Sequence, residues 1–132
     1  MSFNENRAHK IWAVIFLSFA ILIYFLEGVA LNPFAIWNAS PLLISYFLIS
    51  RGLTLNSRPV IIGFAFYTII SLGLLLFGHL AWYFDWQGTK TGSSTSGLIF
   101  IFLPLYAVIL GGIGYLFGWL AGTAINRLRR KT

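Results

Sequence analysis

The sequence predicts an all-α integral membrane protein with four transmembrane helices in a compact bundle. Of its 132 residues, 58% are hydrophobic and only 9% are charged, whereas a soluble domain typically carries about 25% charged residues. The charged residues also leave four long uncharged runs, each close to the roughly 20 apolar residues with which a helix crosses a bilayer core. These runs cover residues 11–26, 28–50, 59–84 and 91–126.

Length and composition narrow the class of protein further. We expect one domain, residues 1–132, because four spans use nearly all of the chain. There is no cysteine, which excludes disulfide bonds and thiol chemistry. The net charge of +6 is spread singly between apolar spans or lies in the basic tail. We therefore expect the lipid bilayer, and no nucleic acid, as a partner.

The distribution of basic residues predicts the orientation. Eight of the nine Lys and Arg residues precede the first span, lie between the second and third spans, or follow the fourth. With four spans these regions share one side, and only Lys90 falls on the other. Because cytoplasmic loops are enriched in Lys and Arg, we expect both termini in the cytoplasm and a bacterial inner (plasma) membrane location.

The first span is expected at about 9–30. Glu27 lies about 25 Å of helix beyond Lys10, which places its carboxylate near the outer headgroups. An acid at that depth, rather than at the bilayer centre, counts against proton-coupled transport. The same segment has features of a signal peptide, including the small residues Gly28 and Ala30. We expect a retained span, since the charge balance already fits four spans.

The second span, about 34–50, is irregular in its outer half. Asn38, Ser40 and Pro41 interrupt the apolar run, and proline removes a backbone donor. Ser40 has the position of a helix N-cap. A kinked span fits this pattern, as does an extended outer segment followed by a short helix.

The third span, about 59–84, begins after Ser57 with Pro59 at the first helical turn. Its outer end carries several aromatic residues, which are typical of a membrane interface. This belt places His79 near the outer boundary and Asp85 among the headgroups or in water.

The fourth span, about 97–126, would extend about 44 Å as a helix, so we expect it to tilt or to project beyond the core. Small residues recur along one face, a pattern that lets two helices approach closely. We expect this face to pack inside the bundle, with self-association or binding of another membrane protein as the alternative. The small-residue face consists of Ala107, Gly111, Gly114, Gly118 and Gly122.

Polar residues from the two outer loops form the candidate ligand-binding site. Hydroxyls and backbone donors just before the fourth span, beside a lysine, favour an anionic ligand. The spacing of His79 and Asp85 matches no metal-binding motif, and no nucleophile-elbow pattern is present. We therefore expect no metal and no cofactor, and we assign no catalytic residue; a plain solvated turn is the simplest alternative. The candidate ligand-binding residues are Glu27, His79, Asp85, Lys90, Ser93, Ser94 and Ser96.

These observations favour a non-enzymatic accessory or interaction protein. The alternative is a small transporter or channel with a polar pathway near the break in the second span and the His79–Asp85 pair. A membrane-embedded enzyme is the third possibility, and it requires His79, Asp85 and a hydroxyl within hydrogen-bond reach. A transporter instead predicts polar side chains inside the bundle, for which the candidates are Asn38, Ser45, Tyr67 and Ser71.

Overall fold

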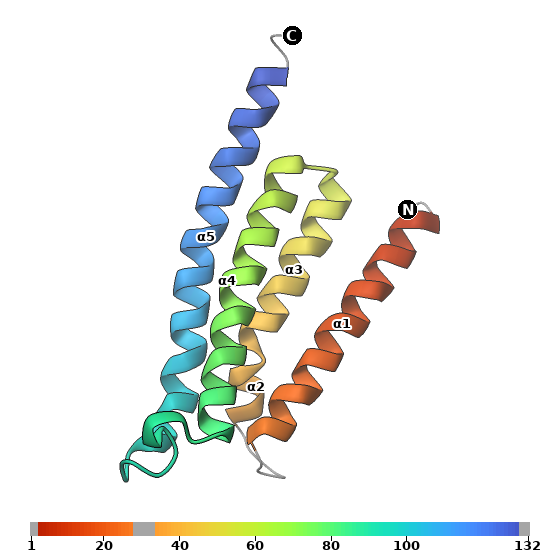
Figure 1. Ribbon diagram of the computed structural model, residues 1–132. Coiled ribbons are helices and arrows are strands. Elements are labelled where there is room, and N and C mark those ends of the chain that lie inside the picture. The colour runs from red at the N-terminus through yellow and green to blue at the C-terminus, as the bar shows by residue number, and fades with distance from the viewer. Residues whose placement is uncertain (1–2, 28–33, 130–132) are drawn as a thin grey trace.

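The computed structural model describes residues 3–27 and 34–129, and every regular element in these ranges is a helix (Figure 1). The long helices run antiparallel along the chain, and a looped segment joins the last two. The elements are α1 (Phe3–Glu27), α2 (Phe34–Asn38), α3 (Ser40–Leu55), α4 (Arg58–Tyr83), the 3-10 turns η1 (Trp86–Gly88) and η2 (Ser96–Leu98), and α5 (Ile99–Arg129).

Within the described residues, three helices are long and apolar enough to cross a membrane. They comprise residues 6–26 of α1, the whole of α4, and residues 96–129, which join η2 to α5. This composition indicates a membrane-embedded helical protein. The predicted spans at about 9–30, 59–84 and 97–126 each overlap one of these helices. Helix α1 begins at Phe3, six residues before the predicted start, and residues 28–30 of that prediction lie outside the described residues.

The predicted second span is broken in two. A turn at Ala39 separates α2 from α3, and α3 has 16 residues, about 24 Å of helix. The predicted N-cap at Ser40 is wrong: Ala39 is the cap residue, and Ser40 is the first residue of the helix. Helix α3 also continues past the predicted end to Leu55, and it stops at Asn56 in a left-handed conformation with φ of 46°.

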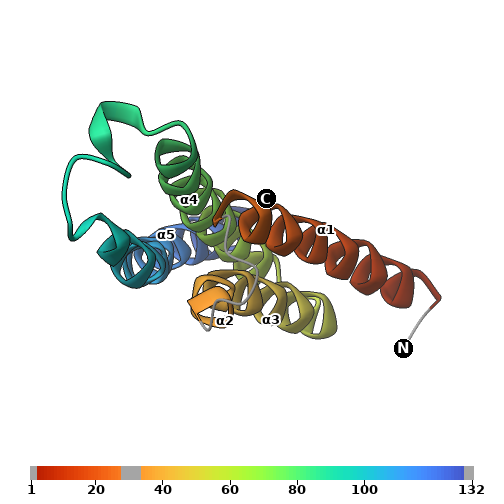
Figure 2. The same cartoon turned by 90° about the horizontal axis from the view of Figure 1, so that it is seen from below.

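Helix α4 is the centre of the bundle. It packs against α5, α3 and α1, and the view along the bundle shows it between α5 on one side and α1 and α3 on the other (Figure 2). We call the end at which α4 passes into α5 the loop end. The opposite end, which we call the basic end, is where α1 begins and α5 finishes (Figure 1). It carries Arg7, Lys10, Arg51, Arg58, Arg127 and Arg129.

The small-residue face of α5 lies directly against α4. All five of its residues are buried. A Cβ atom added to Gly118 would lie 2.8 Å from the carbonyl oxygen of Ile62, and one on Gly122 would lie 2.7 Å from Cα of Pro59. The two backbones are therefore in close contact along the C-terminal half of α5. Self-association through this same face would require α5 to separate from α4.

Helix α1 is held less closely than the others. Phe16 and Ile23 are its buried hydrophobic residues in the described structure, and the helix leans away from the bundle toward the basic end (Figure 1). At that end, the Nδ1 atom of His9 lies 3.3 Å from the hydroxyl of Ser50 on α3.

Candidate functional site

The outer loop is organised around the carboxylate of Asp85. Its Oδ1 atom accepts hydrogen bonds from the backbone N–H groups of Lys90 at 2.8 Å and Thr91 at 3.1 Å, and its Oδ2 accepts one from the Thr91 hydroxyl. Asp85 itself has a positive φ of 50°. The carboxylate therefore closes a ring of backbone between residues 85 and 91.

These bonds favour the charged form of Asp85. The hydrogen bond from the Thr91 hydroxyl, followed by that from the Lys90 backbone, lowers the pKa of this carboxyl below its ordinary value of 3.8. Because the stabilised form is the carboxylate, the loop is held most firmly when Asp85 is ionised.

Two of the predicted serines, Ser93 and Ser96, form hydrogen bonds within the turn at residues 93–96. The Ser96 hydroxyl donates to the Ser93 carbonyl at 2.7 Å, and the Ser93 hydroxyl lies 2.9 Å from that of Thr95. Ser94 and Lys90 have exposed side chains. The hydroxyls of this loop thus stabilise the start of α5 locally rather than converging on a shared ligand position.

His79 is separated from this loop by burial. Its side chain has no solvent exposure, its Nδ1 donates to the Leu75 carbonyl at 2.7 Å, and its ring lies against that of Phe100 with centroids 5.7 Å apart. Asp85, in contrast, is committed to residues 90 and 91. Each of these two residues thus has a hydrogen-bond partner within its own segment of the chain.

The predicted cluster also included Glu27. The side chain of Glu27 lies outside the described residues. Among the side chains that the structure does describe, no three His, Asp or Glu residues lie close enough together to hold a metal ion.

A different group of polar residues lies inside the bundle. The four residues named above as transporter candidates are indeed buried: Asn38, Ser45 and Ser71 have no exposure and Tyr67 has 2%. Thr68 and Ser40, which we did not single out as interior residues, also bury their hydroxyls. We call these six residues the interior polar row: Asn38, Ser40, Ser45, Tyr67, Thr68 and Ser71.

Helix register brings members of the interior polar row to similar depths. Tyr67 and Ser71 are one turn apart, and a Cβ atom on Gly111 would lie 3.0 Å from each of them. Near the basic end, Gly52 of α3 faces Ile61 of α4. Two turns further on, the same antiparallel register places Ser45 beside Thr68.

Asn38 extends the interior polar row toward the loop end. Asn38 is fully buried and lies on α2, on the loop-end side of the turn at Ala39. Its neighbour Trp37 fixes the position of α2 by donating its Nε1–H to the Ile101 carbonyl of α5 at 2.9 Å. Along α4 the row extends from Tyr67 to Ser71, about 6 Å of helix, and His79 lies about two turns further toward the loop end.

The interior polar row has few hydrogen-bond partners among the described residues. Both amide atoms of Asn38 and the hydroxyls of Ser40, Ser45 and Thr68 have none. The Tyr67 and Ser71 hydroxyls interact with each other and, in the described part of the chain, have no partner outside the row. Burying a polar group without a partner costs free energy, and the cost rises as the surroundings become more apolar. Five unpartnered atoms in one region require an explanation.

The basic half of the interior is aromatic instead. Trp12 and Phe16 of α1 contact Phe64 of α4, with ring centroids 5.2 Å and 6.5 Å away respectively. Tyr46 of α3 lies 6.3 Å from Phe16. We call these four residues the aromatic cluster. Phe64 lies just under one turn from Tyr67, so the cluster closes the interior directly beyond the polar row.

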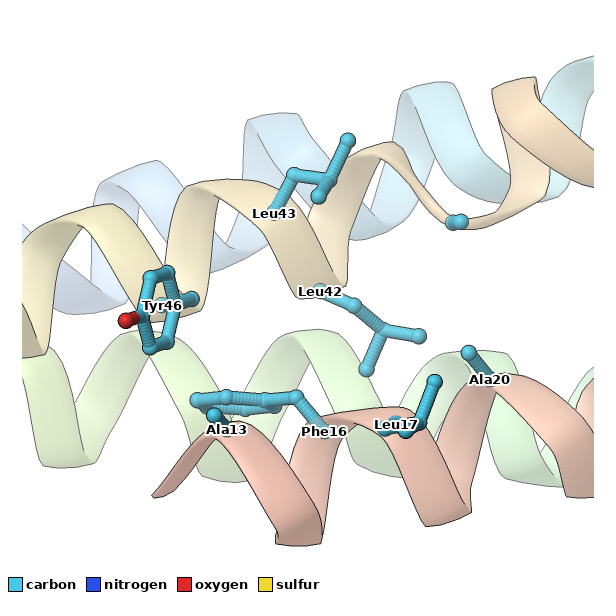
Figure 3. A pocket seen from close by; sticks show the side chains of 8 residues that line it. Ala13, Phe16, Leu17, Ala20, Leu42, Leu43 and Tyr46 are labelled. Atoms are coloured by element: carbon cyan, nitrogen blue, oxygen red, sulfur yellow. The ribbon is translucent and has the colours of Figure 1, made fainter. Parts of the chain in front are cut away.

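Beside the aromatic cluster, an open groove of about 250 Å³ runs between α1 and α3. Figure 3 shows Phe16 and Leu17 of α1 facing Leu42 and Tyr46 of α3 across it. Three alanines leave this space open, because their side chains are much shorter than those of the other lining residues. They are Ala13, Ala20 and Ala39. The groove has almost no polar surface, so it suits apolar groups of the membrane.

Comparison of the chain with known protein families, with curated proteins and with solved structures finds no match to any of them. Function must therefore be argued from the residues themselves.

Proposed function

We propose that this protein is a small membrane transporter or channel that passes water or small uncharged polar solutes along its interior polar row. The observation that carries the proposal is the set of five buried side-chain oxygen and nitrogen atoms, on Asn38, Ser40, Ser45 and Thr68, that have no partner among the described residues. Polar atoms at membrane depth are retained where they serve a pathway or a bound molecule, because without one they only destabilise the fold.

The chemistry of the interior polar row selects the solute. Hydroxyls and a carboxamide each donate and accept hydrogen bonds, which matches water, polyols and urea-like molecules. The interior polar row contains no charged residue, and an ion inside the bundle would have no opposite charge there to offset its desolvation. Uncharged solutes are therefore the expected class.

In this proposal the structure represents a closed state. Asn38, Ser45, Tyr67 and Ser71 have little or no exposure, and the half-buried Ser40 and Thr68 have covered hydroxyls, so a solute reaches the row only after a movement. The aromatic cluster is the barrier on the basic side, and α1, which supplies two of its four rings, is the element expected to move. On the loop side, the contacting rings of His79 and Phe100 lie beyond the row.

The orientation belongs to the same proposal. We place α2 and α3 together as a fourth, broken span, so that both termini lie in the cytoplasm and the 84–98 loop outside. Six described Arg and Lys residues at the basic end support this direction. A bacterial inner membrane is the location that this pattern fits. Broken spans are tolerated where they line a pathway.

The accessory-protein hypothesis stays a prediction of the sequence. Two features suggested it, the small-residue face and the outer hydroxyls. The first is covered by α4, and most of the second bond within their own loop. The interior polar row is the feature left without a use, and for this reason we favour transport.

The test is solute entry into proteoliposomes. Vesicles carrying the purified protein are shrunk osmotically with urea or glycerol, and the rate of re-swelling is recorded. We expect faster solute entry than in empty vesicles, and a large loss of that increase in Asn38→Leu and Thr68→Val. Thr54→Val is the matched control, because the Thr54 hydroxyl is exposed and bonds to the Ser50 carbonyl.

A closed resting state is addressed with Phe16→Ala, which removes a ring from the aromatic cluster. This variant should admit solute faster than wild type. If neither wild type nor Phe16→Ala differs from empty vesicles for water, urea and glycerol, the transport proposal is wrong, and co-purification of membrane partners becomes the next experiment.

A further inference from the structure

A small hollow at the basic end lies between the first turn of α4 and the last turns of α5. Its volume is about 220 Å³, and it is lined by Pro59, Thr123, Asn126 and Arg127. It belongs neither to the interior polar row nor to the outer loop.

The hollow follows from the way that the two helices meet. Gly122 allows contact so close that a Cβ there would lie 2.7 Å from Cα of Pro59. One residue further on, Thr123 begins the lining. The Thr123 hydroxyl is already bonded to the Trp119 carbonyl at 2.9 Å. The groups left for a ligand are therefore the amide of Asn126 and the guanidinium of Arg127.

The depth of the hollow is set by both helices. The apolar run of α4 starts at Pro59, directly after Arg58, and that of α5 ends at Ile125, before Asn126 and Arg127. Both helices thus change from apolar to basic at the same level. In a bundle that spans a membrane, this is the level of the lipid headgroups.

We propose that this hollow binds the phosphodiester group of an anionic phospholipid. The planar guanidinium of Arg127 matches two phosphate oxygens, and the Asn126 amide adds a donor. The positive end of the α4 dipole lies at the same wall, and the exposed Arg58 adds to the positive potential. No lining residue is acidic. A phospholipid fits better than free phosphate, because the lining is otherwise apolar and adjoins the lipid-facing surface of both helices.

This inference does not depend on the transport proposal. The experiment is native mass spectrometry of the full chain in detergent, titrated with phosphatidylglycerol, phosphatidylcholine or inorganic phosphate. We expect one molecule of phosphatidylglycerol to be retained more strongly than phosphatidylcholine. Arg127→Gln should weaken that retention about tenfold, which is the scale of one charge-assisted hydrogen bond.

Arg51→Gln is the matched control, since Arg51 is also exposed at the basic end but lies on α3. It removes the same charge and should leave retention unchanged. Asn126→Leu should weaken retention without changing the net charge. Thermal unfolding without lipid checks that each variant is folded.

Three results would overturn the assignment. Equal retention of the anionic and zwitterionic lipids would show that the phosphodiester site has no preference for charge. Equal weakening in Arg127→Gln and Arg51→Gln would reduce the effect to overall charge. Displacement of phosphatidylglycerol by millimolar inorganic phosphate would show that a free anion, not a lipid, is the ligand.

Discussion

The two halves of the bundle interior contain different kinds of side chain, aromatic toward the basic end and polar toward the loop end. Toward the basic end, four aromatic side chains fill the space between α1, α3 and α4 and contact one another. Toward the loop end, the interior contains hydroxyls and a carboxamide, most of which have no hydrogen-bond partner in the described residues. At the basic end, the buried polar atom without a partner in the described residues is Nε2 of His9. The Nδ1 atom of the same ring lies 3.3 Å from the Ser50 hydroxyl.

The difference shows which half is complete on its own. Aromatic rings gain dispersion and edge-to-face contacts from each other and need no further molecule. Hydroxyl and amide groups gain little from packing and need hydrogen bonds. The aromatic half is therefore expected to contribute stability, while the polar half is expected to cost stability and to serve a function. Four predictions test this contrast, in order of expected effect.

The largest effect is expected in the aromatic half. Phe16→Ala should lower the free energy of unfolding by about 3–5 kcal/mol, because it leaves a cavity between three helices. Thermal unfolding in detergent measures this. Phe25→Ala on the same helix is the control, since Phe25 is 73% exposed. Equal losses in the two variants would contradict the idea that the cluster holds α1 in place.

The contact between α4 and α5 supports both halves and should be the next most sensitive. Gly118→Ala places a Cβ 2.8 Å from the Ile62 carbonyl oxygen, and we expect a loss of about 1–3 kcal/mol from overpacking. Gly112→Ala provides the comparison, because nothing lies within 4 Å of the added atom. That variant should gain up to about 1 kcal/mol through helix propensity. A stability gain in both variants would show that the helices separate more easily than the structure indicates.

In the polar half the sign should reverse. Asn38→Leu removes an amide that has no protein partner and keeps a similar volume, so the free energy of unfolding should stay level or rise by about 1–2 kcal/mol. The same variant should lose solute entry in proteoliposomes. A clear fall in stability would mean that the amide has a structural partner, and the contrast between the halves would then disappear.

The smallest effect is expected at low pH in the outer loop, where Asp85 becomes protonated. The pKa of Asp85 is lowered in the folded protein, first by the Thr91 hydroxyl, so its contribution to loop stability is complete above the unfolded value of about 3.9. That contribution is lost as the pH falls through the lower folded value. The protection factors of the Lys90 and Thr91 amides, which compare the measured exchange rate with the intrinsic rate at the same pH, should fall below about pH 4 in wild type. Asp85→Asn should exchange quickly at neutral pH; protection that persists in this variant would contradict the account.

Much of the fold was readable from the pattern of residues. Runs of apolar side chains located α4 and α5 within three residues, because a helix in lipid must satisfy its own backbone and must be long enough to cross. Helix α1 begins six residues before the predicted start, in a polar segment that the apolar pattern does not include. The break near Pro41 was also visible, although the cap assigned to Ser40 was wrong. The serine hydroxyl turned inward instead, and Ala39 took the cap position.

The candidate site was less predictable. His79 and Asp85 are six positions apart and share an end of the bundle, yet one is sealed against Phe100 and the other is bonded to Lys90 and Thr91. Sequence spacing did not distinguish these environments, since the direction of a side chain depends on which neighbour packs against it. Thr68 and Ser40 were overlooked for the same reason.

The sequence by itself determined the class of environment, the positions of the long helices and the end that carries positive charge. These properties follow from transfer free energies that each residue carries wherever it lies along the chain. Only the tertiary structure decided which polar groups are left without partners and which small residues contact a backbone. Those outcomes depend on the register and rotation of helices distant in sequence, where a rotation of about half a turn exchanges a buried hydroxyl for an exposed one.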